Sequence, residues 1–334
     1  MLRLVALLSP LSLLVVGCGE GDDAAGTGEV SAVAAVYPLA WLAEQVAPDV
    51  RVTPLNAGGL EAHDLEMTPD QRQVIETSDV VLFVGDIGYQ PQVEAAVDAA
   101  RGKVVSLAEV AGTERLLAPA EDRHGHQGDE HASGAGEAGE GGEAGEEPHA
   151  GEEPHAGEEE ATVDPHIWFD PQVMADAAGR AGEAFAAADP ANAATYRSNA
   201  EELQGQLRRL EAELAELLGG PCRHQEAIVS HQAYAYLLEP FGFAQHGVTG
   251  IDPEAGVSSA ELAELVGEIR AEGFEYVLTE PVEGRDGAET VAREAGVELL
   301  EISPLDAVTE DQAEVGLVGL VRDQAEQFAL ALGC

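Results

Sequence analysis

The chain has 334 residues, of which 45% are hydrophobic, and this is enough to bury the cores of about two domains. Its 63 acidic residues outnumber its 16 basic residues and give a net charge of −47. Such a surface repels nucleic acid and anionic lipid head groups, because binding to either needs clustered cations. The composition therefore excludes a nucleic-acid-binding protein and favours cations as ligands, although the same charge also serves solubility.

Residues 1–18 have the pattern of a targeting segment. Arg3 is followed by an apolar stretch at 4–16 that is too short to cross a bilayer. Small residues then precede Cys18, as in the lipobox of bacterial lipoproteins, where the cysteine is lipidated and becomes the mature N-terminus. We expect a lipid-anchored protein outside the cytoplasm, with residues 19–29 as a flexible tether. The alternative is an ordinary signal peptide with an incidental cysteine.

Residues 30–119 alternate between strand and helix patterns. The predicted strands are 32–36, 50–55, 80–84 and 104–107, and the predicted helices are 37–46, 69–77 and 91–100. Thr68 and Pro69 are typical of a helix start, with a capping residue followed by proline at the first helical position. This alternation predicts a parallel α/β sheet in an N-terminal lobe covering 30–188.

Residues 121–162 interrupt that lobe. The segment is rich in Gly and Glu and repeats Gly-Glu-Glu-Pro-His-Ala at 145–150 and 151–156. It cannot bury enough apolar surface to offset its ordering entropy, so we predict a disordered loop. Histidine-rich tracts bind metals weakly, and a spacer with chance histidines is the alternative. The histidines of the loop are His124, His126, His131, His149 and His155.

A long helix is predicted next, over 189–220, after a shorter helix at 172–187. Leucines at 203, 207, 210, 214 and 217 recur at spacings of three and four residues, which indicates one apolar face. A helix of this length measures about 40 Å, which is long for one small domain. We expect it to link the first lobe to a second.

The second lobe, 221–334, repeats the α/β pattern. Its predicted strands are 227–230, 243–248, 276–279 and 297–302, and its predicted helices are 232–240, 258–271, 287–295 and 310–331. The predicted fold class is therefore α/β, with two parallel-sheet lobes joined by one long linker helix. An oxidising compartment permits a Cys222–Cys334 disulfide, which would pin the C-terminal helix to this lobe. Two free thiols or a thiolate metal site are the alternatives.

Three histidines outside the acidic loop are candidate metal ligands. His63 and His231 follow predicted strands, one in each lobe, and His166 lies in an Asp-Pro-His motif. Ligands of open α/β sheets gather at the carboxyl ends of strands, so these side chains could converge between the lobes. No two of them have a local metal-ligand spacing, and each could instead be a hydrogen-bonded or surface histidine.

Three neutral imidazoles suit zinc, which accepts nitrogen ligands in four-coordinate geometry. Calcium and magnesium would require oxygen ligands. Each ligating ring needs a neighbour that accepts its other N–H, and the candidates for this role are Asp164, Asp170 and Glu280.

The motifs around these histidines resemble those of the metal-binding solute-binding lipoproteins of ABC transporters (cluster A-I, ZnuA/TroA-like). The resemblance covers 30–334. The segments that carry it are Gly59-Leu60-Glu61-Ala62-His63-Asp64-Leu65-Glu66, Asp164-Pro165-His166-Ile167-Trp168-Phe169-Asp170-Pro171, Ser230-His231-Gln232-Ala233-Tyr234 and Tyr276-Val277-Leu278-Thr279-Glu280-Pro281. The usual proline before the first histidine is Ala62 here.

This resemblance implies two α/β lobes with a metal in the cleft between them, and Zn²⁺ as cargo for an ABC permease and its ATPase. Zinc members resemble this chain in having a histidine at the position of His231, where manganese members tend to have glutamate. Ser303 occupies the place where many members carry an aspartate. The fourth ligand is thus expected to be water, with Glu61, Glu280 or Asp306 as the alternatives. We expect a monomer.

Other functions remain open on the sequence alone. A manganese- or other divalent-metal-binding protein of the same family, or a surface adhesin or zinc store, would carry the same ligands. A zinc hydrolase would need a general base beside an activated water, and Glu280 or Glu61 would be the candidates. No motif supports such a base, so we expect a binding protein rather than an enzyme.

Overall fold

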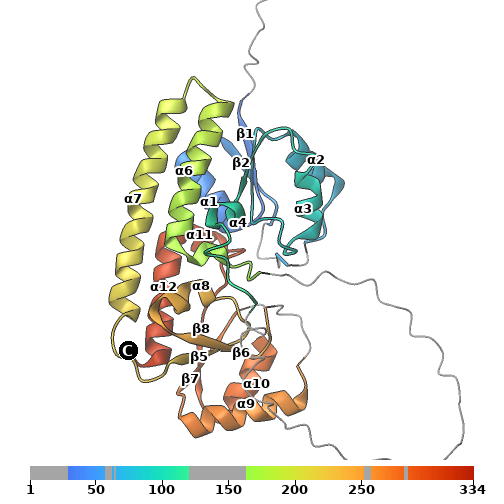
Figure 1. Ribbon diagram of the computed structural model, residues 1–334. Helices are drawn as coiled ribbons and strands as arrows, with labels where there is room; N and C mark the ends of the chain where they lie inside the picture. The colour runs from blue at the N-terminus through green and yellow to red at the C-terminus, as the bar shows by residue number, and fades with distance from the viewer. Residues whose placement is uncertain (1–28, 57–61, 64, 120–162, 252–256, 282–284) are drawn as a thin grey trace, which may run out of the picture.

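The computed structural model describes residues 29–56, 62–63, 65–119, 163–251, 257–281 and 285–334. It contains two four-stranded parallel sheets with the strand orders β2-β1-β3-β4 and β6-β5-β7-β8. Figure 1 shows them one above the other, each with its own helices. The predicted fold class of two parallel-sheet α/β lobes is confirmed.

Most of the helices and strands predicted for the first lobe are present in the structure. Its strands are β1 (Ser31–Ala34), β2 (Arg51–Pro54), β3 (Val80–Phe83) and β4 (Lys103–Ser106), and its helices before the acidic loop are α1 (Tyr37–Val46), α2 (Pro69–Thr77), α3 (Pro91–Val97) and α4 (Leu107–Ala111). The Thr68 side chain accepts a hydrogen bond from the Gln71 N–H and closes a capping box, as the start signal of α2 predicted. Helix α4 was not predicted, because five residues are too few for a periodic pattern.

The second lobe differs from the prediction at its C-terminal helix. Its elements are β5 (Glu226–Val229), α8 (Ala235–Leu238), η2 (Glu239–Phe241), β6 (Ala244–Gly247), α9 (Ser259–Glu272), β7 (Tyr276–Thr279), α10 (Arg285–Ala295), β8 (Glu298–Glu301), α11 (Glu310–Val315) and α12 (Leu317–Leu332). The prediction of one helix over 310–331 was wrong. Gly316 has a φ of 78°, which ends α11 and starts α12 in a new direction. A side chain there would also approach the Trp41 ring.

The long helix is α7 (Ala193–Leu218), which follows α6 (Pro171–Ala188). Figure 1 shows α7 running beside both lobes, against α6 above and α12 below. Its leucines at 203, 207, 210 and 214 are buried as the periodicity predicted, and Leu218 rather than Leu217 continues the buried face. At about 1.5 Å per residue, the helix is long enough to reach from one sheet to the other.

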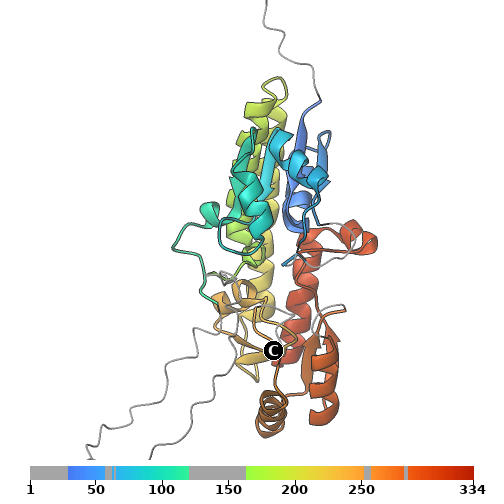
Figure 2. The ribbon, with the colours of Figure 1, turned by 90° about the vertical axis from the view of Figure 1, so that its right-hand side faces the viewer.

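The two lobes are in direct contact. One continuous hydrophobic cluster includes side chains of α1, α7 and α12. The Trp168 indole N–H donates to the Pro304 carbonyl at 2.8 Å, and the Tyr236 hydroxyl donates to the Asp164 carbonyl at 3.1 Å. Figure 2 shows the lobes stacked along the same long helices. Such packing opposes a large hinge opening.

The predicted disulfide is present and joins Cys222 to Cys334. It ties the chain just after α7 to Cys334, two residues beyond the end of α12. Among the described residues, no helix combines the length and hydrophobicity needed to cross a bilayer. The predicted signal peptide with Cys18, the tether up to residue 28, the acidic loop with its five histidines, and Glu61 lie outside the described residues.

Candidate metal centre

The structure brings His63, His166 and His231 together from three separate segments. His63 follows β2, His166 immediately precedes η1 (Ile167–Phe169), and His231 follows β5. One ring nitrogen from each lies within 4.8 Å of the other two. Zinc–nitrogen bonds of about 2.0–2.1 Å would place tetrahedral ligands about 3.3 Å apart, so side-chain movements of about 1.5 Å would close a site. The ring centroids are 5.4 to 6.3 Å apart.

Asp164 fixes the orientation of His166. Its Oδ1 lies 2.9 Å from His166 Nδ1 and also accepts the His166 backbone N–H at 3.0 Å. Because an ionised carboxylate only accepts, Nδ1 carries the ring proton and Nε2 offers its lone pair. This Nε2 is buried and has no hydrogen-bond partner among the described residues. An unpaired buried nitrogen of this kind fits a metal ligand.

Glu280 has the same relation to His231. Its Oε2 lies 2.9 Å from His231 Nδ1, and its Oε1 accepts the Tyr234 hydroxyl at 2.9 Å. Both His231 and Glu280 are almost fully buried. The carboxylate thus fixes the ring so that its Nε2 faces away from Glu280. The role of Tyr234 was not predicted, although the residue lies in the same motif as His231.

His63 is partly buried and lies edge-on to the Tyr89 ring, at a centroid separation of 4.6 Å. Burial lowers the pKa of His63 well below its usual value, and positive charge on His166 and His231 lowers it further. The ring therefore stays neutral at a lower pH than a free histidine does. Competition between protons and a metal for this nitrogen consequently begins only below the usual histidine range.

The residues considered for a fourth ligand have other contacts. The Ser303 hydroxyl accepts the Leu305 N–H at 3.3 Å, and Asp306 accepts the Ala307 N–H at 2.8 Å and the Ala62 N–H at 3.3 Å. Glu280 is held by His231 and Tyr234. Burial raises the pKa of the Asp306 carboxyl, while the nearby His166 and His231 lower it. Burial thus favours the neutral carboxyl, and Asp306 is not one of the side chains that form the histidine cluster.

Asp170 has a different role from the one considered for it. Its Oδ1 accepts the N–H groups of Gln172 and Val173 at 2.8 and 3.1 Å, and it therefore caps α6. The ring-orienting carboxylate in this motif is Asp164. Sequence alone could not separate the two, because both lie within four residues of His166.

A glutamine in place of Glu280 is expected to lower zinc affinity by about ten- to a hundredfold, as is typical when an orienting partner of a metal-bound histidine is changed. The amide can still accept one hydrogen bond, but it lacks the charge that supports the Nδ1–H tautomer of His231. Chelator competition measures this affinity.

The matched control for that experiment is Glu275→Gln. Glu275 is exposed beside the opposite end of β7 and pairs with Arg223 at 3.0 Å, so this variant loses the same charge away from the histidines. Equal affinities of the two variants would contradict the orienting role of Glu280.

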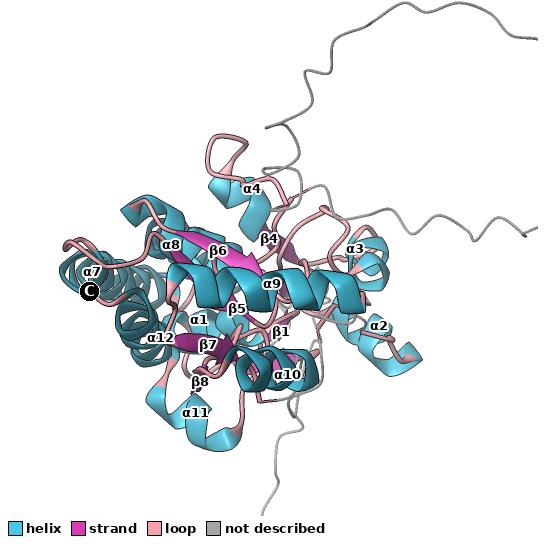
Figure 3. Ribbon diagram, turned by 90° about the horizontal axis from the view of Figure 1, so that it is seen from below, coloured by secondary structure: helices cyan, strands magenta, loops and turns pink. Residues whose placement is uncertain are grey.

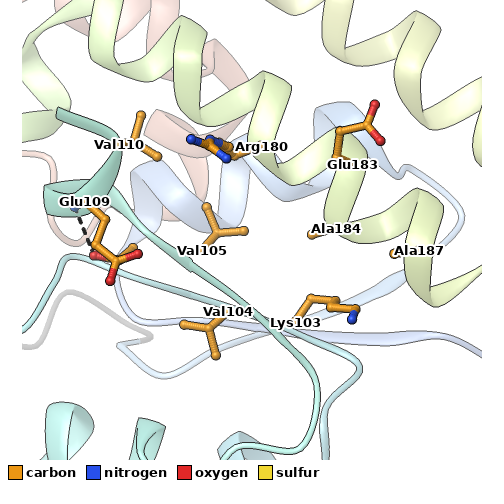
Figure 4. A pocket seen from close by; sticks show the side chains of 10 residues that line it. Lys103, Val104, Val105, Glu109, Val110, Arg180, Glu183, Ala184 and Ala187 are labelled. Atoms are coloured by element: carbon orange, nitrogen blue, oxygen red, sulfur yellow. Dashed lines mark hydrogen bonds between the residues drawn. The ribbon is translucent and has the colours of Figure 1, made fainter. Parts of the chain in front are cut away.

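A pocket of about 400 Å³ lies elsewhere, between β4 and α6 (Figure 4). Its lining mixes aliphatic and charged side chains, which are Lys103, Val104, Val105, Ser106, Glu109, Val110, Arg180, Glu183, Ala184 and Ala187. None of the three histidines contributes to it. The metal chemistry therefore does not involve this pocket.

Comparisons with known proteins agree with the fold. A family model described as ZnuA, zinc-uptake complex component A periplasmic, matches residues 32–331. The zinc-binding lipoprotein AdcA of Streptococcus pneumoniae is 26% identical over 311 residues, which are 93% of this chain and 56% of AdcA. The high-affinity zinc uptake system protein ZnuA of Bacillus subtilis is 26% identical over 129 residues, which are 39% of this chain and 40% of that protein. The chain spans about half the length of the AdcA relatives that it matches.

Two solved structures have the same fold. The Zn(II)-bound ZnuA-like domain of Streptococcus pneumoniae AdcA has a TM-score of 0.68 at 20% identity, covering 92% of this chain and 100% of that one. The periplasmic zinc-binding protein TroA of Treponema pallidum has a TM-score of 0.72 at 18% identity, with the same coverage. At these identities, the likeness establishes the arrangement of lobes and helices.

Proposed function

The chain belongs to the ZnuA family of zinc-uptake components, and from this premise we propose that it binds Zn²⁺ outside the cytoplasm and delivers it to an ABC-type importer. Zinc is the cargo in this proposal and undergoes no covalent chemistry. The ligands are His63, His166 and His231. The observation that carries the proposal is the convergence of these three imidazoles, two of which have their Nδ1 beside a buried carboxylate.

The donor set favours zinc over manganese. Three neutral nitrogens suit a borderline-soft ion, whereas Mn²⁺ prefers sites with more carboxylate oxygen. Asp164 and Glu280 are engaged at the far nitrogens of their histidines, so they raise the basicity of the rings instead of contributing oxygen ligands. We assign the fourth position to water, with Glu61, Glu280 or Asp306 as the alternatives; Ser303 and Asp306 also accept backbone N–H groups.

The remaining parts of the chain fit the same role. We assign 1–18 to a lipoprotein signal peptide with Cys18 as the lipid anchor, and 19–29 to a tether. The N-terminal lobe is 30–188, the linker helix 189–220 and the C-terminal lobe 221–334. The acidic segment 121–162 and its histidines would raise the local cation concentration. A monomer of this design would present its loaded site to a permease and the ATPase that drives it.

The contacts of Glu280 argue against a zinc hydrolase. A hydrolase needs a base that faces the metal-bound water, and Glu280 is instead engaged by His231 and Tyr234. The observation removes Glu280 as a base, and Glu61, the other candidate, lies outside the described residues. A surface adhesin or a zinc store would use the same ligands, so only transport distinguishes these functions from delivery.

Zinc accumulation in cells that lack the gene tests delivery directly. In zinc-poor medium, the wild-type gene is expected to restore accumulation, and a gene encoding His231→Ala is expected not to restore it. The Glu275→Gln gene serves as the matched positive control. Normal accumulation without the gene, combined with tight zinc binding by the purified protein, would contradict delivery and favour a store or an adhesin.

A further inference from the structure

A second cluster of metal-ligating side chains lies in the C-terminal lobe, apart from the three histidines. Glu226, His246 and Glu268 each place a ligand atom within 4.8 Å of the other two. His246 Nδ1 lies 3.5 Å from Glu268 Oε2. We propose that these three side chains form a second, weaker binding site for a first-row divalent transition cation such as Zn²⁺. This site goes beyond the delivery function proposed above.

The sheet register explains why two of these residues meet. Ile228 of β5 pairs with His246 of β6, and Glu226 lies two residues before Ile228. Side chains two residues apart on a strand point to the same face of the sheet, so Glu226 and His246 share one face. Strand β6 is the edge of its sheet, and both side chains are partly exposed.

Helix α9 supplies the third side chain. Its Leu265 and Ile269 pack on Ile228 in one core cluster, so α9 covers the face that carries Glu226 and His246. Glu268 precedes Ile269 and therefore lies on the flank of the helix, at the margin of the core. Figure 3 shows α9 lying across β5 and β6. The backbone packing thus fixes all three residues on well-ordered elements instead of loops.

The chemistry of the cluster suits a transition cation. Two carboxylates and one imidazole provide the mixed oxygen and nitrogen donors that zinc accepts, whereas calcium prefers oxygen alone. The side chains of His246 and Glu268 are 39% and 30% exposed. A cation bound there would exchange readily with solvent, and solvent would screen its attraction to the carboxylates more strongly than at the buried three-histidine centre. The site should therefore bind more weakly than the three-histidine centre.

The two sites should load independently. Glu226 begins β5, and His231 lies beyond the strand's last residue, Val229. At about 3.3 Å per residue, the strand separates Glu226 from Val229 by about 10 Å, and the two sets of ligands share no residue.

Nuclear magnetic resonance of the histidine rings can follow each site in the full-length protein. The ring signals of His246 are assigned by their loss in His246→Gln, and zinc is added beyond one equivalent. We expect the first equivalent to shift the signals of the buried histidines, and further zinc to shift those of His246. This resolves the second site from any binding by the loop histidines, which have signals of their own.

Carboxylate variants decide whether His246 binds alone or as part of a site. Glu226→Gln and Glu268→Gln are each expected to raise the zinc concentration at half-saturation of His246 by at least about tenfold. Glu264→Gln, an exposed residue one turn earlier on α9, should leave it unchanged. Half-saturation equal to the wild type in both cluster variants would overturn the proposal, as would His246 signals that do not move in millimolar zinc.

The same titration separates this proposal from the proposed delivery function. In His231→Ala, the first transition should be weakened and the His246 transition retained. Loss of the tight site with retention of the second would therefore leave the second site standing. If the tight transition were preserved but His246 did not respond, only the second site would be refuted. Circular dichroism of each apo variant confirms that the lobe is folded.

Discussion

Replacing His166 with alanine is expected to lower the zinc affinity of the purified protein by more than about a hundredfold. Changes to a residue that only orients a ligand already cost about ten- to a hundredfold, and loss of the ligand itself should cost more. His166 is fully buried, and the alanine leaves a space lined by His63, His231 and Trp168 that one water cannot fill with an equivalent donor. The affinity is measured by chelator competition.

The control for that experiment is His224→Phe. His224 is a buried histidine outside the cluster, and its ring stacks on Phe274 at a centroid separation of 4.5 Å, so phenylalanine preserves the stacking. This variant should bind zinc as the wild type does. The wild type should also bind Zn²⁺ more tightly than Mn²⁺. Unchanged affinity in His166→Ala, or equal affinity of the wild type for both metals, would contradict the zinc centre.

Removing the disulfide between Cys222 and Cys334 is expected to destabilise the folded protein strongly. The double variant Cys222→Ala/Cys334→Ala should lower the free energy of unfolding by about 5 kcal/mol, which the chain-entropy model gives for a loop of about a hundred residues. The sequence separation of the two cysteines is 112. The bridge also holds the ends of α7 and α12 together, where the Arg223 N–H donates to the Leu332 carbonyl at 2.9 Å. Urea unfolding followed by circular dichroism measures the change.

Wild-type protein unfolded in the presence of a reductant is the matched control. It should unfold at the same urea concentration as the double variant, because both lack the same cross-link. Zinc binding by the folded double variant should stay close to that of the wild type, since neither cysteine belongs to the cluster of His63, His166 and His231. An unfolding midpoint equal to that of the oxidised wild type would contradict a stabilising role for the disulfide.

The packing between the lobes bears on how zinc would leave the proposed site. The hydrophobic core continues through α7 and α12, and hydrogen bonds from Trp168 and Tyr236 cross between the lobes. A large hinge opening would have to break these contacts together. Release from the proposed site would therefore need only small movements of the segments that carry the three histidines. Of the three histidines, His63 is the least buried.

The local pattern of apolar and polar residues was sufficient to predict most of the helices and strands. Buried apolar runs such as β3 and the leucine face of α7 depend on the periodicity of neighbouring residues, so they are visible in the sequence. The three histidine motifs could be found in the sequence for a related reason. Each lies on a short segment that resembles a motif of the metal-binding solute-binding lipoproteins. The break at Gly316 was missed, since glycine within a helical pattern does not show that its φ is positive.

By itself, the sequence determined the two α/β lobes, the long helix between them and the three histidines as candidate ligands. Only the tertiary structure decided that Asp164 and not Asp170 orients His166, and that Ser303 and Asp306 bind backbone N–H groups. It also decided that Glu226, His246 and Glu268 meet. The physical reason is that these contacts depend on strand register and helix packing between segments that are far apart in the chain. Local spacing carries no record of such contacts.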